Sequence, residues 1–239
     1  MLSDLKINKV LFLNIETAPI KYNFEELSPV FQNLWIEKTD CQRKEEFSTS
    51  EFYKKKAGVM AEFAKVVCIS VGYLFLERGE NHFRIKSFYT EEEKELLSEF
   101  ILLLNKEFNT KSHILCAHNG KEFDFPFLAR RILVNELKLP KLLNIAGKKP
   151  WEVNHLDTMD LWRFGDYKNY TSIKLLSALF NIPTPNYNID GSQVSRVYWK
   201  EKDLERIKIY CQKDTIIVAQ LLLKYMGKDL IKEENIEFV

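Results

Sequence analysis

The sequence VLFLNIET, at residues 10–17, begins with four apolar residues and ends with polar ones. A continuous apolar run of this kind is typical of a strand that is buried on both faces and carries its polar residues at the C-terminal end. Side chains two apart in a strand point to the same face, so we expect Asn14 and Glu16 to lie side by side beyond the run. Two oxygen-bearing side chains there can hold Mg²⁺, and the simpler alternative is a strand that leaves the core and meets water.

The rest of the chain alternates between strand and helix patterns. β-branched, aromatic or short apolar runs predict strands at residues 65–76, 82–89 and 113–117. Apolar residues at helical spacing predict helices at about 91–108, 124–137, 157–163, 172–180 and 202–226. This order predicts an α/β fold in which a mixed β-sheet is flanked by helices.

Residues 20–60 are polar and dense in charge, and we expect a largely helical insertion between the first two strands. The simplest organisation is a single domain over residues 1–239 that carries this insertion. The run Lys54, Lys55 and Lys56 is first of all typical of a solvated helix face. Two alternatives are a contact with nucleic acid and a protein partner that docks on the insertion.

Composition narrows the class of protein. Hydrophobic residues make up 46% and charged residues 29% of the 239 residues, which is usual for a globular domain. A net charge of +1, from 35 basic and 34 acidic residues, argues against a protein that coats DNA tightly, but allows an enzyme that holds a few nucleotides at a strand end. The longest apolar runs are too short to span a bilayer, and no signal-peptide core precedes the first strand, so we expect a cytoplasmic protein without membrane contact.

A second polar cluster follows the short strand at 113–117, in the sequence AHNGKEFDFPFLARR. Asp124 at the predicted helix start is explained by helix capping, in which the carboxylate accepts backbone N–H groups. Capping does not explain why His118, Asn119 and Lys121 gather before it. A lone histidine is more often structural than functional, so His118 keeps both interpretations.

A third acid lies within the last predicted helix. Apolar residues there follow one helical face, at Ile207, Cys211, Ile217, Val218 and Leu221. Asp214 interrupts this stripe and therefore points inward, with Tyr210 one turn away on the same face. A buried unpaired carboxylate is costly, so it either has a raised pKa or coordinates a cation. The alternative is that Tyr210 is a core aromatic and Asp214 pairs with a basic residue elsewhere.

Together the three segments resemble the DnaQ-like 3′–5′ exonucleases of the RNase H-like fold, in the DEDD group whose third motif contains tyrosine. The chain is most similar to predicted exonucleases related to the proofreading domain of family B DNA polymerases. The motif Asp-x-Glu-Thr corresponds to residues 14–17, Asn-Gly-x-x-Phe-Asp to residues 119–124, and Tyr-x-x-x-Asp to residues 210–214. Ile209 occupies the place of the histidine of the sister group, which favours the tyrosine subtype. Each motif alone is weak, but three in order are a specific signal.

The resemblance implies a hydrolase that uses two divalent metal ions, Mg²⁺ or Mn²⁺. It would release nucleoside 5′-monophosphates from the free 3′ end of single-stranded nucleic acid, with DNA favoured over RNA. Asn14, Glu16, Asp124 and Asp214 would hold the metal ions, and Tyr210 with Glu16 would orient the attacking water. Contacts to the terminal nucleotide are expected from Leu13, Ile15, Thr17, His118, Asn119, Lys121 and Phe123.

Asn14 departs from the motif, which has aspartate at this position. An asparagine offers one neutral carbonyl oxygen and cannot bridge two cations with a full negative charge, so we expect impaired activity. An engineered Asp→Asn change, a natural variant of low activity and a true pseudoenzyme all fit, and the intact remaining motif residues favour the first. The competing functions are an inactive exonuclease-fold module that binds single-stranded nucleic acid or a protein partner, and an endonuclease of the same fold.

Overall fold

The computed structural model describes residues 2, 4–43, 46–166, 168–183 and 189–239. In this part of the chain one mixed sheet contains six strands in the order β5-β4-β1-β2-β3-β6. The strands are β1 (Val10–Pro19), β2 (Ala64–Glu77), β3 (Glu80–Phe88), β4 (Ile114–Ala117), β5 (Leu156–Asp157) and β6 (Ile236–Phe238). β1 runs parallel to β4 and antiparallel to β2, and β2 forms a hairpin with β3. The predicted α/β fold with a mixed sheet is confirmed.

Helices cover both faces of this sheet. The α-helices are α1 (Pro29–Arg43), α2 (Thr49–Lys56), α3 (Glu93–Glu107), α4 (Asp124–Val134), α5 (Thr158–Arg163), α6 (Ile173–Leu179), α7 (Val194–Arg196) and α8 (Leu204–Tyr225). Short 3₁₀ turns are η1 (Ile7–Lys9), η2 (Phe24–Glu26), η3 (Ala57–Val59), η4 (Lys141–Leu143), η5 (Pro150–Glu152) and η7 (Glu233–Asn235). The helices predicted from apolar spacing are confirmed, with ends that differ by a few residues. None of the helices within the described ranges is long and apolar enough to cross a bilayer.

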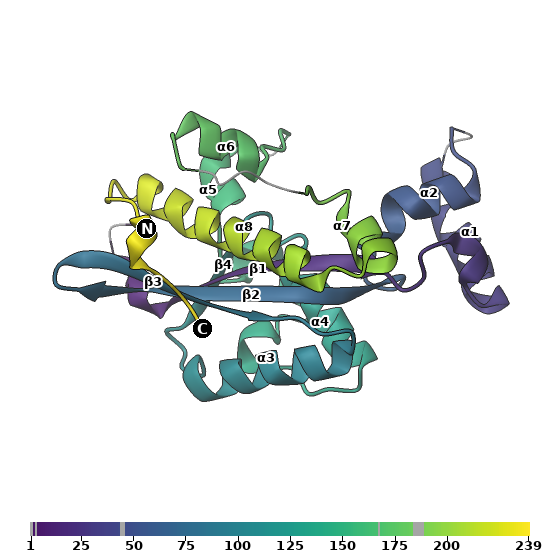
Figure 1. Cartoon of the computed structure of the whole chain (residues 1–239), viewed down its shortest axis with the longest axis horizontal. Coiled ribbons are helices and arrows are strands. Elements are labelled where there is room, and N and C mark those ends of the chain that lie inside the picture. The colour runs from purple at the N-terminus through teal and green to yellow at the C-terminus, as the bar shows by residue number, and fades with distance from the viewer. Residues whose placement is uncertain (1, 3, 44–45, 167, 184–188) are drawn as a thin grey trace.

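β1 is buried on both faces because its alternating side chains enter two different apolar clusters. Leu11, Leu13 and Ile15 pack with residues of α3 and α4, whereas Val10 and Phe12 pack against α8. Figure 1 shows the same layers, with α8 along one side of the sheet and α3 and α4 on the other. The even-numbered side chains of β1 that follow Phe12 therefore face α8 as well.

The segment between β1 and β2, where we expect a helical insertion, contains η2, α1, α2 and η3. It has an apolar cluster of its own, in which Trp35 and Tyr53 are fully buried with their rings 5.0 Å apart. Ser48 begins α2 with a capping box to Glu51. In Figure 1 the two helices of the insertion extend past one end of the sheet, next to the C-terminal end of β1.

Three short elements differ from the prediction. β5 has two residues and β6 has three, which is too short to show a two-residue period. Residues Val197–Glu201 form a π-helix between α7 and α8, followed by Lys202 with φ of 56°. β1 also continues to Pro19, with a register shift against β2 between Glu16 and Thr17. The polar motif residues therefore lie within the strand and not after it.

Candidate active site

Asn14 and Glu16 lie side by side on the face of β1 that is covered by α8. The Asn14 amide Nδ2 donates to Glu16 Oε1 at 3.1 Å and to Cys211 Sγ at 3.5 Å. The Cys211 thiol in turn donates to the backbone oxygen of Asn14 at 3.3 Å. These bonds hold the motif strand against the helix that carries the third acid. The neighbouring side chains predicted from the two-residue period are thus found together.

Asp124 does not cap α4, so the capping interpretation is wrong. The residue before the helix, Phe123, makes no side-chain cap. Instead Asp124 Oδ1 accepts the backbone N–H of Ile15 at 3.2 Å, which ties α4 to the middle of the motif strand. The turn before the helix is tight, because a Cβ at Gly120 would lie 2.4 Å from the Cβ of Ala117. Only glycine fits there, and the close approach brings Asp124 to β1.

Asp214 completes a cluster of three carboxyl groups from β1, α4 and α8. Its side chain is buried, at 7% exposure, and its charge raises the pKa of both Glu16 and Asp124. For Glu16, burial raises the pKa most, followed by the neighbouring Cys211 and Asp214. Burial likewise raises the pKa of Asp124 to about 8. Three acids that repel one another inside the protein are the setting that a bound cation relieves.

Asp157 was not singled out from the sequence, yet it holds the turn that precedes Asp124. One of its oxygens accepts the backbone N–H of Asn119 at 2.9 Å, and the other accepts that of Lys121 at 3.0 Å. The same carboxylate caps α5 through the N–H groups of Met159 and Asp160. Asn119 adopts φ of 62°, a left-handed conformation that asparagine tolerates. Asp157 lies at the end of a two-residue strand, which is too short to give a periodic pattern in the sequence.

A cavity of about 580 Å³ opens beside Asn14 and Asp124. Its lining includes six residues that the sequence predicted for the site, namely Asn14, Ile15, His118, Asn119, Phe123 and Asp124. It also includes Lys56, Val59 and Tyr170, which the sequence did not assign to the site. Glu16 and Asp214 are not among the residues that line it. The cavity is within the usual size range of a small-ligand site, roughly 300–1,000 Å³.

Two of the predicted nucleotide contacts have other partners. His118 Nδ1 lies 2.9 Å from Thr158 Oγ1 and its Nε2 lies 2.9 Å from the backbone oxygen of Thr171. Both ring nitrogens are therefore engaged, and burial lowers the pKa of the imidazole. The ammonium group of Lys121 lies 3.5 Å from the Asp160 carboxylate. The structural interpretation fits His118, and Lys121 is not among the residues that line the cavity.

Leu13 and Thr17, which were also predicted to contact the terminal nucleotide, have other neighbours in the structure. Leu13 is 0% exposed within the apolar cluster under α3 and α4, so it has no free face for a base and its predicted contact is wrong. The Thr17 hydroxyl donates to the backbone oxygen of Gly58 at 2.6 Å. Thr17 thus joins β1 to the end of the insertion.

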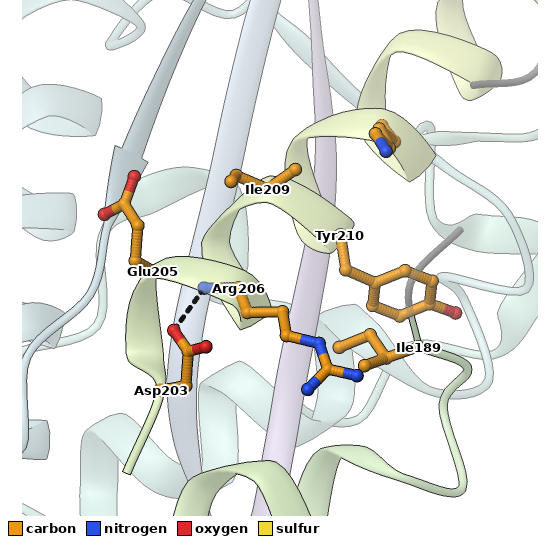
Figure 2. Close-up of a pocket in the computed structure, with 7 residues that line it drawn as sticks. Ile189, Asp203, Glu205, Arg206, Ile209 and Tyr210 are labelled. Atoms are coloured by element: carbon orange, nitrogen blue, oxygen red, sulfur yellow. Dashed lines mark hydrogen bonds between the residues drawn. The ribbon is translucent and has the colours of Figure 1, made fainter. Parts of the chain in front are cut away.

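Tyr210 lies on α8 one turn before Asp214, but its ring is directed to a different cavity. Figure 2 shows Tyr210 beside Ile189 and Arg206, which line a cavity of about 280 Å³ with it. A Cβ at Gly191 would lie 3.9 Å from the Tyr210 hydroxyl. The structure therefore does not bring Tyr210 into the cavity that contains Asn14 and Asp124.

The acids at β1, α4 and α8 are hard oxygen donors of the kind that Mg²⁺ and Mn²⁺ prefer. A different group of possible metal ligands is also present, on strands β2, β3 and β6. Among the described residues, ligand atoms of Glu77, His82 and Glu237 all lie within 4.8 Å of one another. In the motif cluster Asn14 contributes an amide that donates to Glu16, where an aspartate would contribute a further charged oxygen. The donor set fits a hard divalent cation, with one ligand weakened.

Residues 59–234 match a protein family described as "Predicted 3′–5′ exonuclease related to the exonuclease domain of PolB". This range covers well over half of the chain. The chain belongs to this family. The matched residues of this exonuclease-family protein include Asp124, Asp157, Tyr210 and Asp214, and the RNase H-like fold predicted for it is confirmed. β1, with Asn14 and Glu16, lies before the matched range, so its place in the site rests on the geometry above.

Proposed function

We propose that this protein is a divalent-metal-dependent 3′–5′ exonuclease of the tyrosine DEDD subtype, impaired by Asn14, with single-stranded DNA favoured over RNA. The observation that carries the proposal is the convergence of Glu16, Asp124 and Asp214 beside Asn14, from three segments far apart in the sequence. Family membership supplies the reaction class. The preference for DNA comes from the likeness to proofreading domains.

Two divalent ions, when bound, supply activation of a water molecule and stabilisation of the leaving 3′ oxygen. Position 14, Glu16 and Asp214 would hold one ion, and position 14 with Asp124 the other. The reaction adds the water oxygen to phosphorus and breaks the bond to the 3′ oxygen, which leaves with a proton. The products are a nucleoside 5′-monophosphate and a strand with a new 3′ hydroxyl.

The chain's own residues orient the strand end. Ile15 and Phe123 present apolar surface to the cavity, and bases of any sequence can stack on or pack against such side chains. Asn119 Oδ1 is buried without a hydrogen-bond partner among the described residues, so it offers an acceptor to the terminal nucleotide. Tyr210, one turn before Asp214 on α8, would orient the attacking water.

Asn14 weakens this arrangement in two ways. It removes one negative charge next to the cations, and its Nδ2 directs a hydrogen-bond donor at Glu16 Oε1. This hydrogen bond occupies the Glu16 oxygen that would otherwise be available to a cation. Of the two ions, the one that depends more on the ligand at position 14 would therefore bind more weakly.

The test is the variant Asn14→Asp, compared with the unaltered protein on 5′-labelled single-stranded DNA and RNA. With Mg²⁺ or Mn²⁺, and not with EDTA, Asn14→Asp should shorten the strand stepwise from its 3′ end. Adding Glu16→Gln to Asn14→Asp should slow the reaction by about a hundredfold or more, because several kcal/mol of metal stabilisation are lost. A folded Asn14→Asp protein that leaves both strands intact in metal would contradict the proposal.

The bond between Asn14 and Glu16 favours a second candidate, a module that binds single strands without cutting them. In that case the two proteins would bind single strands equally with metal or EDTA, and neither would cut. Cutting of circular single strands would instead indicate an endonuclease. A protein partner for the insertion stays a prediction.

A further inference from the structure

The insertion contributes part of the wall of the catalytic cavity. Lys56, the last residue of α2, and Val59, at the end of η3, both line it, and Tyr170 lines it from the segment between α5 and α6. Among the described residues of this lining, Lys56 is the one that carries a permanent positive charge. The insertion therefore places a cation at the mouth of a cavity whose other charged group is an acid.

The backbone next to Lys56 is held on two sides. Ala57 is fully buried in the apolar cluster of the insertion. The oxygen of Gly58 accepts the hydroxyl of Thr17, one residue past Glu16 on the motif strand. The chain just after α2 is thus bonded to the strand that carries Asn14 and Glu16, which fixes the backbone position of Lys56.

The three lysines at the end of α2 have different surroundings. The ammonium group of Lys55 lies over the Phe47 ring, 4.3 Å from its centroid. The positive charge of Lys54 helps to lower the pKa of Glu25. Lys56 forms no ion pair with the residues that the structure describes, and its side chain is exposed. The lysine that faces the cavity is therefore the one available for an anionic ligand.

Tyr170 offers a different kind of contact. Its side chain is 67% exposed although it lines the cavity. Partial burial raises the pKa of its phenol most, and the charges of Asp124, Asp214 and Asp157 raise it further. The ring therefore lies near the acid cluster. A largely exposed aromatic ring beside a nuclease site is a stacking platform for a base.

We propose that Lys56 and Tyr170 form a clamp on the substrate strand, in which Lys56 binds a backbone phosphate and Tyr170 stacks on a base. The clamp rests on the proposed function, because it assigns the substrate contacts of the same cavity. It gives the insertion a direct part in strand binding.

The test measures binding of fluorescein-labelled oligothymidylate to the full chain in EDTA, over a range of KCl concentrations. Lys56→Met should weaken binding and reduce the slope of log affinity against log salt by about 0.7, the value for one phosphate contact on a single strand. Lys55→Met removes a lysine from the same helix end and should leave the slope unchanged. Equal slopes for Lys56→Met and Lys55→Met would overturn the phosphate contact.

The stacking contact has its own variants. Tyr170→Ala should weaken binding about tenfold with the salt slope unchanged, whereas Tyr170→Phe should bind like the unaltered protein. Phe164→Ala removes a more exposed ring from the same loop, 92% exposed and outside the cavity lining, and should have no effect. A loss that Tyr170→Phe shares, or the same loss in Phe164→Ala, would overturn the stacking contact.

Failure of the clamp is distinguishable from failure of the proposed function. In the Asn14→Asp background, Lys56→Met should raise KM for single-stranded DNA and leave kcat within about twofold, as expected when a uniform binding contact is lost. Strand digestion by Asn14→Asp with unchanged KM in Lys56→Met would overturn the clamp alone. If the unaltered protein does not bind oligothymidylate at low salt, the clamp is overturned whatever the nuclease assay gives.

Discussion

The contact between Asn14 and Glu16 shows how one amide changes the electrostatics of the acid cluster. Glu16 is surrounded by Cys211, Asp214 and Asp124, each of which raises its pKa, and the Asn14 amide is the neighbour that lowers it. An aspartate at this position would add a further negative charge at hydrogen-bond distance from Glu16. Two carboxylates so close together are unfavourable without a cation, so Asn14 is easier to bury beside Glu16 than an aspartate would be.

The pKa of Asp124 predicts how stability depends on pH in the absence of metal. Its value is 3.8 in an unfolded chain and about 8 in the folded protein, so between these values the folded state holds a proton that the unfolded state has lost. Stability in EDTA should therefore fall as pH rises from about 4 to about 8, and level off above that. Urea denaturation at a series of pH values measures this slope.

The variant Asp124→Asn is the control for this slope, because it has no proton to lose. The difference in stability between the unaltered protein and Asp124→Asn should change across the same pH window. Mg²⁺ or Mn²⁺ should flatten the slope of the unaltered protein by favouring the ionised carboxylate. A difference that stays constant with pH would contradict the raised pKa.

The sequence predicted several residues of the site but not how their side chains lie. The two-residue period placed Asn14 and Glu16 together, and the helical stripe placed Asp214 inward, because both periods depend on local geometry alone. The partner of Asp124 is the Ile15 N–H, 109 residues away, and no local pattern carries that contact. The direction of the Tyr210 ring depends equally on distant packing.

At the scale of elements, a buried ion pair joins two helices on the side of the sheet opposite α8. Arg131 of α4 binds Glu93 of α3 through two bonds of 2.9 and 2.6 Å, and also donates to the backbone oxygen of Ala61. Glu93 accepts the backbone N–H of Val66 on β2 as well. Arg131→Met should lower the free energy of unfolding by about 3–5 kcal/mol, because Glu93 would keep a buried charge without its cation.

Urea denaturation measures this loss, and Arg130→Met is the matched control. Arg130 is the preceding residue on the same helix but is exposed, so its replacement should change stability by less than about 0.5 kcal/mol. Similar losses in Arg130→Met and Arg131→Met would show that the pair with Glu93 does not hold α4 in place.

Long elements were predictable and short ones were not, for a reason of scale. β2 and α8 extend over 14 and 22 residues, enough for several periods of their apolar pattern. β5 has two residues and is recognised by its pairing of Cys116 with Leu156, a contact between distant segments. The insertion was predictable as helical, but its packing against β1 was not, since the bond from Thr17 to Gly58 leaves no mark in the sequence.

Across the whole molecule, the site depends on β1, α4, α8 and the insertion meeting at one end of the sheet, and Thr17 is where the insertion is joined to the motif strand. Thr17→Val keeps the branched shape but removes the 2.6 Å bond to Gly58. If this bond positions Lys56, Thr17→Val should weaken oligothymidylate binding about fivefold, as expected for about 1 kcal/mol from one hydrogen bond.

A double-mutant cycle separates this coupling from a general loss of stability. The double variant Thr17→Val with Lys56→Met should bind about as weakly as Lys56→Met alone, since the tether acts through a lysine that is no longer there. Combined with Lys55→Met, the effect of Thr17→Val should persist in full. Additive losses for Thr17→Val and Lys56→Met would show that the tether and the lysine act independently, and that the insertion does not reach the substrate through Lys56.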